Sequence, residues 1–253
     1  MDLEKYKGLS LKKADAAADI ELINRYSVKK LTPEEVYCFS LVLCDNDVDR
    51  DMERFTDTAL EGLARLFLGK TGITDHRWSA ENQFARLYHT ETEVVKGKKN
   101  SLGEPLRVLR GRAYMLRNET TQPTIDAIEG GILKEISVGC AMSTATCSIC
   151  GSDYGCCDHR KGETYNKRLC VCELSNPMDA YEFSFVAVPA QRGAGVTKTA
   201  KNLDDAFELL MTADLSGKTD KVEQLMPVLQ TALADKKEMA ERANIQKYAE
   251  KFR

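Results

Sequence analysis

Proton transfer near neutral pH usually relies on an imidazole, and the chain has only three histidines. His89 lies in an alternating, strand-like run, and His159 lies among cysteines. His76 follows a helical pattern and comes two residues before Trp78, the only tryptophan. The segment around it is typical of a loop, where an imidazole can meet a substrate. His76 is therefore the candidate general base.

A candidate nucleophile is Ser137, in a strand-like segment that is expected to bend at Gly139. A nucleophilic hydroxyl must be exposed and close to backbone N–H groups that can stabilise an oxyanion, and the backbone near Val138 and Gly139 could supply them. Spacing alone favours a structural strand serine and a surface histidine over a catalytic pair. Cys140 is expected to be a core residue and not a nucleophile.

Cysteines provide the second chemical feature. Seven of the nine lie between Cys140 and Cys172, and an odd total without a secretory signal favours metal binding over a disulfide framework. Cys147 and Cys150 form a CxxC pair followed by glycine, a spacing typical of a zinc knuckle. The predicted structural zinc ligands are Cys147, Cys150, Cys157 and His159, with Cys170 or Cys172 as substitutes. Free thiols in an unusual loop are the alternative.

An acidic stretch, residues 45–49, resembles the start of a calcium-binding loop. Such a loop needs glycine at its sixth position and glutamate at its twelfth, where this chain has Arg50 and Thr56. The stretch is therefore expected to be a solvated turn between a strand and a helix.

Composition excludes several classes of protein. The 253 residues are 43% hydrophobic and 30% charged, which is typical of a folded protein. The 36 basic residues nearly balance the 39 acidic ones, and this disfavours nucleic acid as the main partner. The longest apolar run, residues 36–44, is far shorter than the roughly 20 residues that a membrane span needs. We expect a soluble, intracellular chain.

The candidate residues must be positioned by a mixture of strands and helices. Strands are expected over residues 36–43, 86–95, 106–116, 133–142 and 181–188, with a turn over 96–103. A helix capped by Thr56 or Asp57 is expected to end at Gly69, and a short helix is expected over 122–130. Weak helical character over 14–23, a linker over 194–198 and amphipathic helices beyond residue 202 complete the pattern.

Three blocks resemble the caudovirus prohead serine protease family, the head-maturation proteases of tailed phages. They are residues 69–76, which end at His76; residues 131–139, which contain Ile-Ser-Val-Gly; and residues 181–190, which contain Glu-Phe-Ser and end in Val-Pro-Ala. The blocks occur in the family's order, and the resemblance is taken to cover residues 36–196. Family members usually connect the last two blocks briefly, whereas here the cysteine-rich residues 140–176 intervene.

The resemblance implies a serine endopeptidase of α+β class, with a small β-barrel wrapped by helices as in herpesvirus assemblin. By position, Ser137 would be the nucleophile, His76 the base and Glu182 the acidic residue that orients the imidazole. Asp75 is the rival for the acidic role. The expected organisation is an N-terminal arm over residues 1–30, a protease domain over 31–196 with a zinc-binding insert over 140–176, and a helical tail over 197–253. The tail is expected to be either a scaffold-like segment or a helical hairpin packed on the protease domain.

The resemblance also implies the biological setting. The expected substrates are the major capsid protein and the scaffold protein inside the procapsid, in the host cytoplasm. Self-association is a further expectation, as is self-cleavage within residues 194–200. No membrane and no direct nucleic-acid partner are expected, and catalysis would need no cofactor.

Two other functions remain open on the sequence. One is a catalytically inactive, zinc-stabilised scaffold or assembly protein, which the helical tail and the insert beside Ser137 support. The other is a zinc-dependent nucleic-acid binder, which the charge balance disfavours.

Overall fold

A computed structural model describes residues 16–197. The expected tail beyond Thr197 and the first half of the expected N-terminal arm lie outside the described residues. Within residues 16–197, no helix is both long enough and apolar enough to cross a bilayer.

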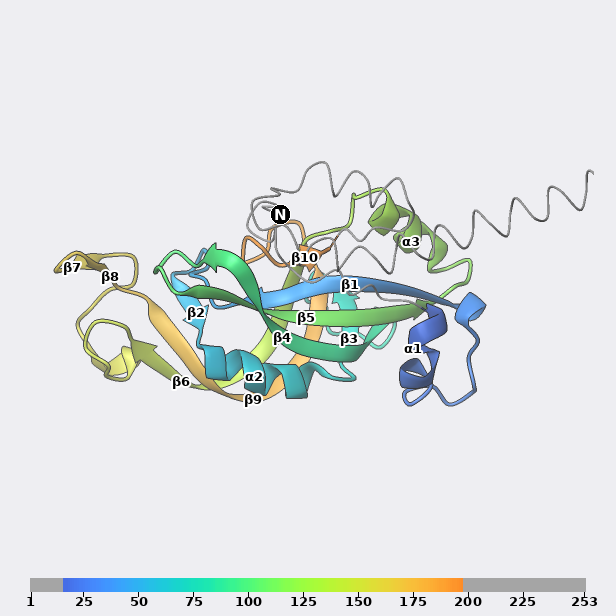
Figure 1. The fold of residues 1–253 in the computed structure, drawn as a ribbon, viewed down its shortest axis with the longest axis horizontal. Coiled ribbons are helices and arrows are strands. Elements are labelled where there is room, and N and C mark those ends of the chain that lie inside the picture. Colours follow the sequence, from blue (N-terminus) through green and yellow to red (C-terminus); the bar gives the residue numbers. More distant parts are fainter. Residues whose placement is uncertain (1–15, 198–253) are drawn as a thin grey trace, which may run out of the picture. The chain divides into compact units, whose positions relative to one another are not determined.

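The described fold is of mixed, broadly α+β class and is built on a large sheet (Figure 1). Eight strands share this sheet in the order β10-β1-β5-β4-β3-β9-β2, with β6 paired to β9. Their bounds are β1 Val36–Asp45, β2 Glu53–Phe55, β3 Thr71–Thr74, β4 Ala85–Lys99, β5 Pro105–Leu116, β6 Ile136–Cys147, β9 Cys172–Phe185 and β10 Gly195–Val196. The short strands β7 Thr164–Tyr165 and β8 Arg168–Leu169 form a separate hairpin.

The α-helices of the described part are α1 Ala16–Ile23, α2 Asp57–Phe67 and α3 Gln122–Glu129. The predicted cap of α2 is confirmed: the Thr56 side chain accepts a hydrogen bond from the Ala59 N–H at 3.2 Å. Leu60, Leu63 and Phe67 recur at helical spacing and are fully buried in the main core. Burial of each such side chain stabilises the fold by about 1.5–3 kcal/mol.

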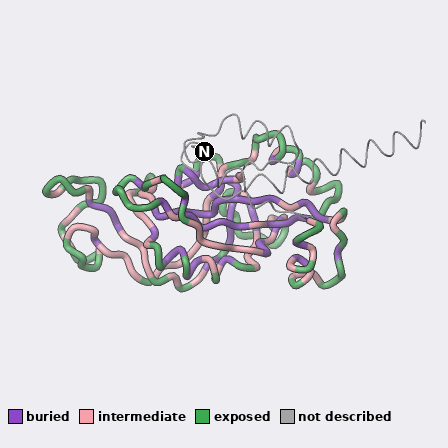
Figure 2. Tube along the Cα trace, viewed as in Figure 1, coloured by how far each residue is buried: buried purple, intermediate pink, exposed green. Residues whose placement is uncertain are grey.

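The main core is formed by buried residues of β1, β5, β9 and α2, and β1 and β5 are largely purple in Figure 2. β1 and β5 are antiparallel from the pair Val36 and Leu116 to the pair Asp45 and Val108, and β4 continues the sheet on the other side of β5. The expected turn over 96–103 is shorter than predicted, because β4 continues to Lys99 and pairs there with Pro105. The strand pairing overrides the turn signals of the lysines and Gly97.

The expected N-terminal arm is in part a packed helix. Asp19 of α1 is buried, and its carboxylate accepts hydrogen bonds at 2.7 Å from the Tyr88 hydroxyl and from the Arg112 guanidinium. Ile23 is also fully buried. These contacts attach α1 to β4 and β5.

The expected closed barrel is not found in the part of the chain that the structure describes. The ladders form an open path, and only an isolated bridge between Glu135 and Gly195 connects the start of β6 to β10. The expected linker over residues 194–198 is wrong at its start, because Gly195 and Val196 form β10 against Val42 and Leu41 of β1. The apolar residues Ala194 and Val196 pack on the main core, which explains why this segment is ordered into a strand.

β6 and β9 form a long antiparallel ribbon that carries the insert at its far end (Figure 1). The ladder continues from the pair Ile136 and Phe185 to the pair Cys147 and Cys172, so much of the expected 140–176 insert is regular sheet. The part of the insert outside this ladder is residues 148–171, and it includes the short β7–β8 hairpin. The ribbon therefore joins the segment of Ser137 directly to the cysteine cluster.

Candidate active site and metal centre

Three adjacent strands bring the predicted catalytic residues together. β9 lies between β3, which is parallel to it, and β6, which is antiparallel. Ser184 of β9 is opposite both Ile73 and Ser137, and Glu182 is opposite Gly139. The expected loop over residues 72–78 is in fact strand as far as Thr74, and His76 follows in the turn after β3.

His76 and Glu182 are in direct contact. The imidazole Nδ1 lies 2.7 Å from Glu182 Oε1, and the Glu182 side chain is only 3% exposed whereas that of His76 is 41% exposed. A carboxylate this buried needs hydrogen bonds, and the Ser184 hydroxyl donates a second one to Oε2 at 2.9 Å. The contact through Nδ1 leaves the Nε2 edge of the ring available to another group.

Ser137 lies on the same face of the sheet as this pair. Cross-strand partners in an antiparallel ladder point to one side, with Cβ atoms about 4.5–5.5 Å apart, so Ser137 is the neighbour of Ser184. The described residues contain no direct hydrogen bond between Ser137 and His76. Catalytic hydrogen bonds are often long in structures without substrate and shorten when substrate binds.

Gly139 makes room for the Glu182 carboxylate. A Cβ atom at position 139 would lie 2.4 Å from Glu182 Oε1, far inside van der Waals contact. The backbone of β6 thus approaches the carboxylate more closely than any other residue would allow. Glycine at this position has a steric reason beyond the expected strand bend.

The other candidates are placed elsewhere. Asp75 donates its backbone N–H to the Phe185 carbonyl and is exposed. His89 lies on β4, 3.8 Å from a Glu91 carboxylate oxygen, and burial followed by the Arg112 charge lowers its pKa. Cys140 packs on the main core, as predicted, and burial followed by the Glu182 charge raises its pKa to about 11. A thiol with this pKa is a poor nucleophile.

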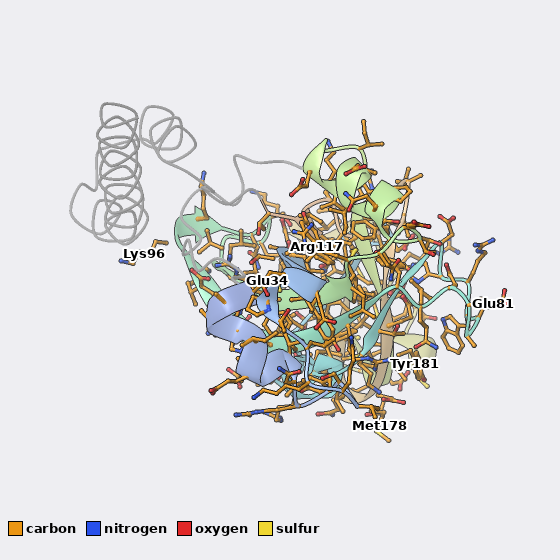
Figure 3. All side chains as sticks on the ribbon, turned by 90° about the vertical axis from the view of Figure 1, so that its right-hand side faces the viewer. Glu34, Glu81, Lys96, Arg117, Met178 and Tyr181 are labelled. Carbon is orange, nitrogen blue, oxygen red and sulfur yellow. The ribbon has the colours of Figure 1, made fainter. Side chains whose placement is uncertain are left out.

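Two exposed aromatic side chains lie beside the pair. Trp78 is 70% exposed, and its ring packs in a tilted arrangement against that of Tyr181, the residue before Glu182, with the ring centroids 5.1 Å apart. Tyr181 and Met178 are the extra residues at two irregularities of the β6–β9 ladder, which turn their side chains to solvent (Figure 3). An apolar surface therefore adjoins the imidazole.

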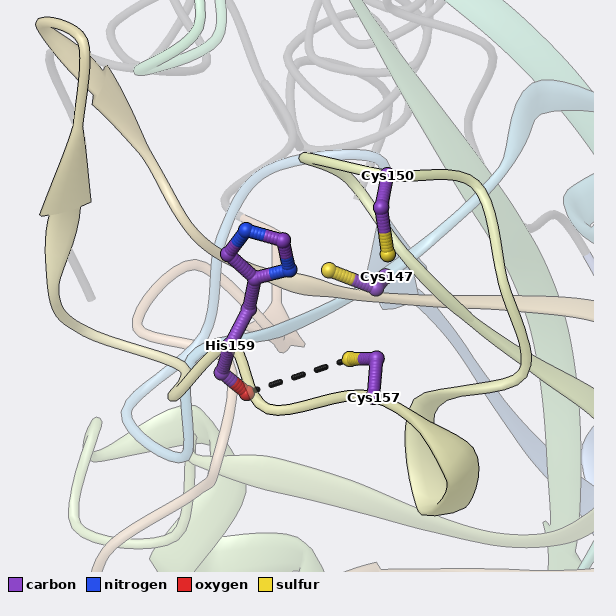
Figure 4. Close-up of side chains that lie close together, drawn as sticks. All are labelled: Cys147, Cys150, Cys157 and His159. Carbon is purple, nitrogen blue, oxygen red and sulfur yellow. Dashed lines mark hydrogen bonds between the residues drawn. The ribbon is translucent and has the colours of Figure 1, made fainter.

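The four predicted metal ligands form one cluster at the far end of the ribbon (Figure 4). Their ligand atoms all lie within 4.8 Å of one another. Tetrahedral thiolates about 2.3 Å from zinc stand about 3.8 Å apart, so a small inward movement would close the site. Cys147 is at the end of β6, Cys150 follows in the knuckle with Gly151 at φ 74°, and Cys157 and His159 come from the next loop.

The polar groups of the cluster fit a metal ion. His159 Nδ1 is buried without a hydrogen-bond partner among the described residues, and Figure 4 shows the ring with this nitrogen toward the sulfurs. Burial raises the pKa of the Cys147 thiol, but backbone N–H groups of Cys150 and Ile149 outweigh burial and lower this pKa to about 7. The backbone N–H of Ser152 lowers the pKa of Cys150. Metals bind the thiolate form, which both shifts favour.

The proposed substitutes are less well placed. Cys170 Sγ lies 3.9 Å from Cys147 Sγ and is buried, but it does not belong to the mutually close set of four. Cys172 is the ladder partner of Cys147 and lies on β9. The CxxC pair with Cys157 and His159 is therefore the set that could hold a metal ion.

No role was predicted for Ser184 from the sequence, and Gly139 was interpreted as a strand bend and a possible backbone donor, without the close approach of Glu182 being foreseen. The signal for Ser184 was its place two residues after Glu182 on a strand, which puts both side chains on one face. Comparison with protein-family models, with curated proteins and with solved structures finds no match to this chain.

Proposed function

We propose that the chain is a serine endopeptidase of the prohead protease type. The observation that carries this proposal is the 2.7 Å contact of His76 Nδ1 with the buried Glu182, on the sheet face that also holds Ser137. In hydrolytic triads a carboxylate contacts Nδ1 of the histidine, while Nε2 accepts the proton of the nucleophile. Here too the carboxylate contacts Nδ1, which leaves Nε2 for the nucleophile.

The proposed chemistry begins with attack of Ser137 Oγ on a peptide carbonyl carbon while His76 Nε2 accepts the hydroxyl proton. Glu182 stabilises the imidazolium that results. His76 then gives the proton to the departing amine nitrogen as the C–N bond breaks, which leaves an acyl group on Ser137. Water attacks this ester with His76 again as the base, and the hydroxyl of Ser137 is regenerated.

The proposed substrates are the major capsid protein and the scaffold protein within a procapsid in the host cytoplasm, and a fold related to that of assemblin, with its sheet open, is part of the same proposal. The isolated bridge between Glu135, just before β6, and Gly195 of β10 supports this relation, because it links two strands that are not neighbours in the ladders of the main sheet. Association of copies of this chain with one another is part of the same proposal. Neither a membrane nor nucleic acid is a proposed partner.

We also propose that the ion of the cysteine cluster is zinc and that it is structural. Four thiolate or imidazole ligands fill a tetrahedral shell and leave no position for a substrate. When bound, zinc would supply a cross-link between the knuckle and the following loop. Catalysis on the opposite end of the ribbon would use the side chains of the chain itself.

The proposal is tested by co-expression of the full chain with the major capsid protein of the phage that encodes it. We expect a new N-terminus on the capsid protein, identified by peptide mapping, and no such cleavage when His76→Ala replaces the wild type. Because the segment from Gly195 to Thr197 is paired with β1, self-cleavage within residues 194–200 should occur after Thr197. A capsid protein that stays intact beside a folded, wild-type chain would contradict the proposal.

A non-enzymatic, zinc-stabilised scaffold remains the second candidate. The observation that favours it is the lack of a direct Ser137–His76 hydrogen bond among the described residues. A fluorophosphonate probe separates the two candidates, because only an activated serine reacts with it.

The close approach at Gly139 gives a sharp test of the orienting role of Glu182. Gly139→Ala should displace the carboxylate from Nδ1 and lower the rate of Ser137 modification by about 10²- to 10⁴-fold. The measurements are the labelling rate by mass spectrometry and the thermal midpoint of unfolding. Since Oε1 ends a flexible side chain, we expect a loss of stability of only about 1–3 kcal/mol.

The control is a double-mutant cycle with Glu182→Ala. If Gly139→Ala acts through the carboxylate, the double variant should be no slower than Glu182→Ala alone. Independent, additive losses would show that the alanine disturbs something other than Glu182.

A further inference from the structure

Ser184 is the most completely buried polar side chain near the proposed active site, with no exposed surface. It lies on β9 between Ile73 of β3 and Ser137 of β6, where three strands run side by side. A buried hydroxyl must be satisfied by hydrogen bonds, so its partners show what it holds.

Its partners are the two members of the His76–Glu182 pair. The Ser184 hydroxyl donates to Glu182 Oε2 at 2.9 Å, and its oxygen accepts the backbone N–H of His76 at 3.0 Å. A serine hydroxyl has one donor and two acceptor sites, so both bonds form at once. One oxygen atom therefore fixes the carboxylate and the backbone of the base together.

The backbone of His76 needs such support because it is strained. Asp75 and His76 have φ values of 53° and 51°, in the left-handed region that costs a non-glycine residue energy. They form the centre of a turn closed by the Arg77 N–H and the Thr74 carbonyl at 3.1 Å, as in a type I′ turn. Strained residues persist where their surroundings fix them, and here the Phe185 carbonyl and Ser184 Oγ hold the two successive N–H groups.

We infer that Ser184 is a positioning residue for the proposed reaction. Its hydroxyl keeps Glu182 Oε1 directed at Nδ1 and keeps the turn in the conformation that presents the imidazole to the Ser137 face. The geometric part of this inference stands on the hydrogen bonds alone. Its consequence for catalysis rests on the proposed function.

The experiment compares Ser184→Ala, Ser184→Cys and Ser184→Thr in the full chain. Cysteine nearly preserves the volume but hydrogen-bonds weakly, so it removes the bonds without a cavity, and threonine keeps the hydroxyl. The first readout is the ¹⁵N NMR signature of the His76 ring, which reports which nitrogen carries the proton. The second is the rate at which a fluorophosphonate labels Ser137.

We expect the alanine and cysteine variants to lose the ordered Nδ1–H signal and to label Ser137 about 10- to 100-fold more slowly. The threonine variant should keep both properties close to wild type. Ser143→Ala is the control, because Ser143 lies on the same ribbon and its hydroxyl contacts only the Asn176 carbonyl at 3.0 Å.

Alanine and cysteine variants with the wild-type ring signature and labelling rate would overturn the inference. So would a threonine variant as impaired as the other two, because the hydroxyl would then be irrelevant. If the wild type is not labelled at all while the ring signature still depends on the hydroxyl, the proposed function fails and the positioning role of Ser184 stands.

Discussion

Replacement of Ser137 by alanine is expected to abolish cleavage of the capsid protein and all fluorophosphonate labelling, a loss of about 10⁴- to 10⁶-fold in rate. Two nearby side chains could not replace Ser137, the proposed nucleophile: Ser184 is buried and engaged with His76 and Glu182, and burial raises the pKa of Cys140 to about 11. His76→Ala should be comparably inactive. The measurement is intact-mass analysis after exposure to the probe, followed by peptide mapping.

Folding should be almost unaffected by the change. Ser137 is half-buried, and loss of such a hydroxyl usually alters the free energy of unfolding by no more than about 0.5 kcal/mol. Ser143→Ala on the same strand is the matched control and should label at the wild-type rate. Labelling of the Ser137→Ala chain at another serine, or unchanged cleavage of the capsid protein, would remove Ser137 from the mechanism.

The sequence predicted the elements that carry strong local signals. The α2 helix was predictable because Thr56 can cap it and its apolar residues recur at helical spacing. β1, β4 and β5 were predictable from β-branched and aromatic residues. The ends of the strands were not predictable from the sequence. The length of β6 and β9, for example, is set by pairing between residues far apart in the chain. The polar stretches near Ser143 and Ser175 carry no strand pattern of their own.

The candidate site also has some features that the sequence could predict and others that it could not. Residue types and local context made His76 and Ser137 candidates, the resemblance added Glu182, and a strand topology was needed to bring His76 to Glu182. Neither the left-handed turn at His76 nor the buried hydroxyl of Ser184 has a local sequence signal. In contrast, the spacing of Cys147, Cys150, Cys157 and His159 was enough to predict a cluster, because short loops limit how far the four can separate.

The insert at the end of the ribbon should depend on its metal for stability. Between Ser148 and Val171 only Cys170 and Val171 are buried, and the hydrophobic core clusters contain no residue of this segment. A segment without a core cannot offset its conformational entropy by apolar burial. Structural zinc sites contribute about 10–16 kcal/mol in small zinc domains, which is ample for a loop of this size.

We therefore expect one zinc per wild-type chain by elemental analysis, and loss of that zinc in Cys150→Ser. Cys150 is exposed, so the change itself should cost little apart from the ligand. Cys156→Ser is the matched control, since Cys156 is also exposed but lies outside the cluster. Limited proteolysis should cut Cys150→Ser, or the wild type treated with a chelator, within residues 148–171, and should leave Cys156→Ser intact.

The same variants decide whether the metal takes part in catalysis. Ser137 is held at the other end of β6 by pairing with Ser184, beside the buried Phe183 and Phe185 of the main core. Cys150→Ser should therefore still react with a fluorophosphonate at Ser137. A chain without zinc, or equal metal loss in Cys156→Ser, would contradict the structural site. Loss of labelling in a Cys150→Ser chain whose core remains folded would instead show that the metal end of the ribbon controls the position of the nucleophile.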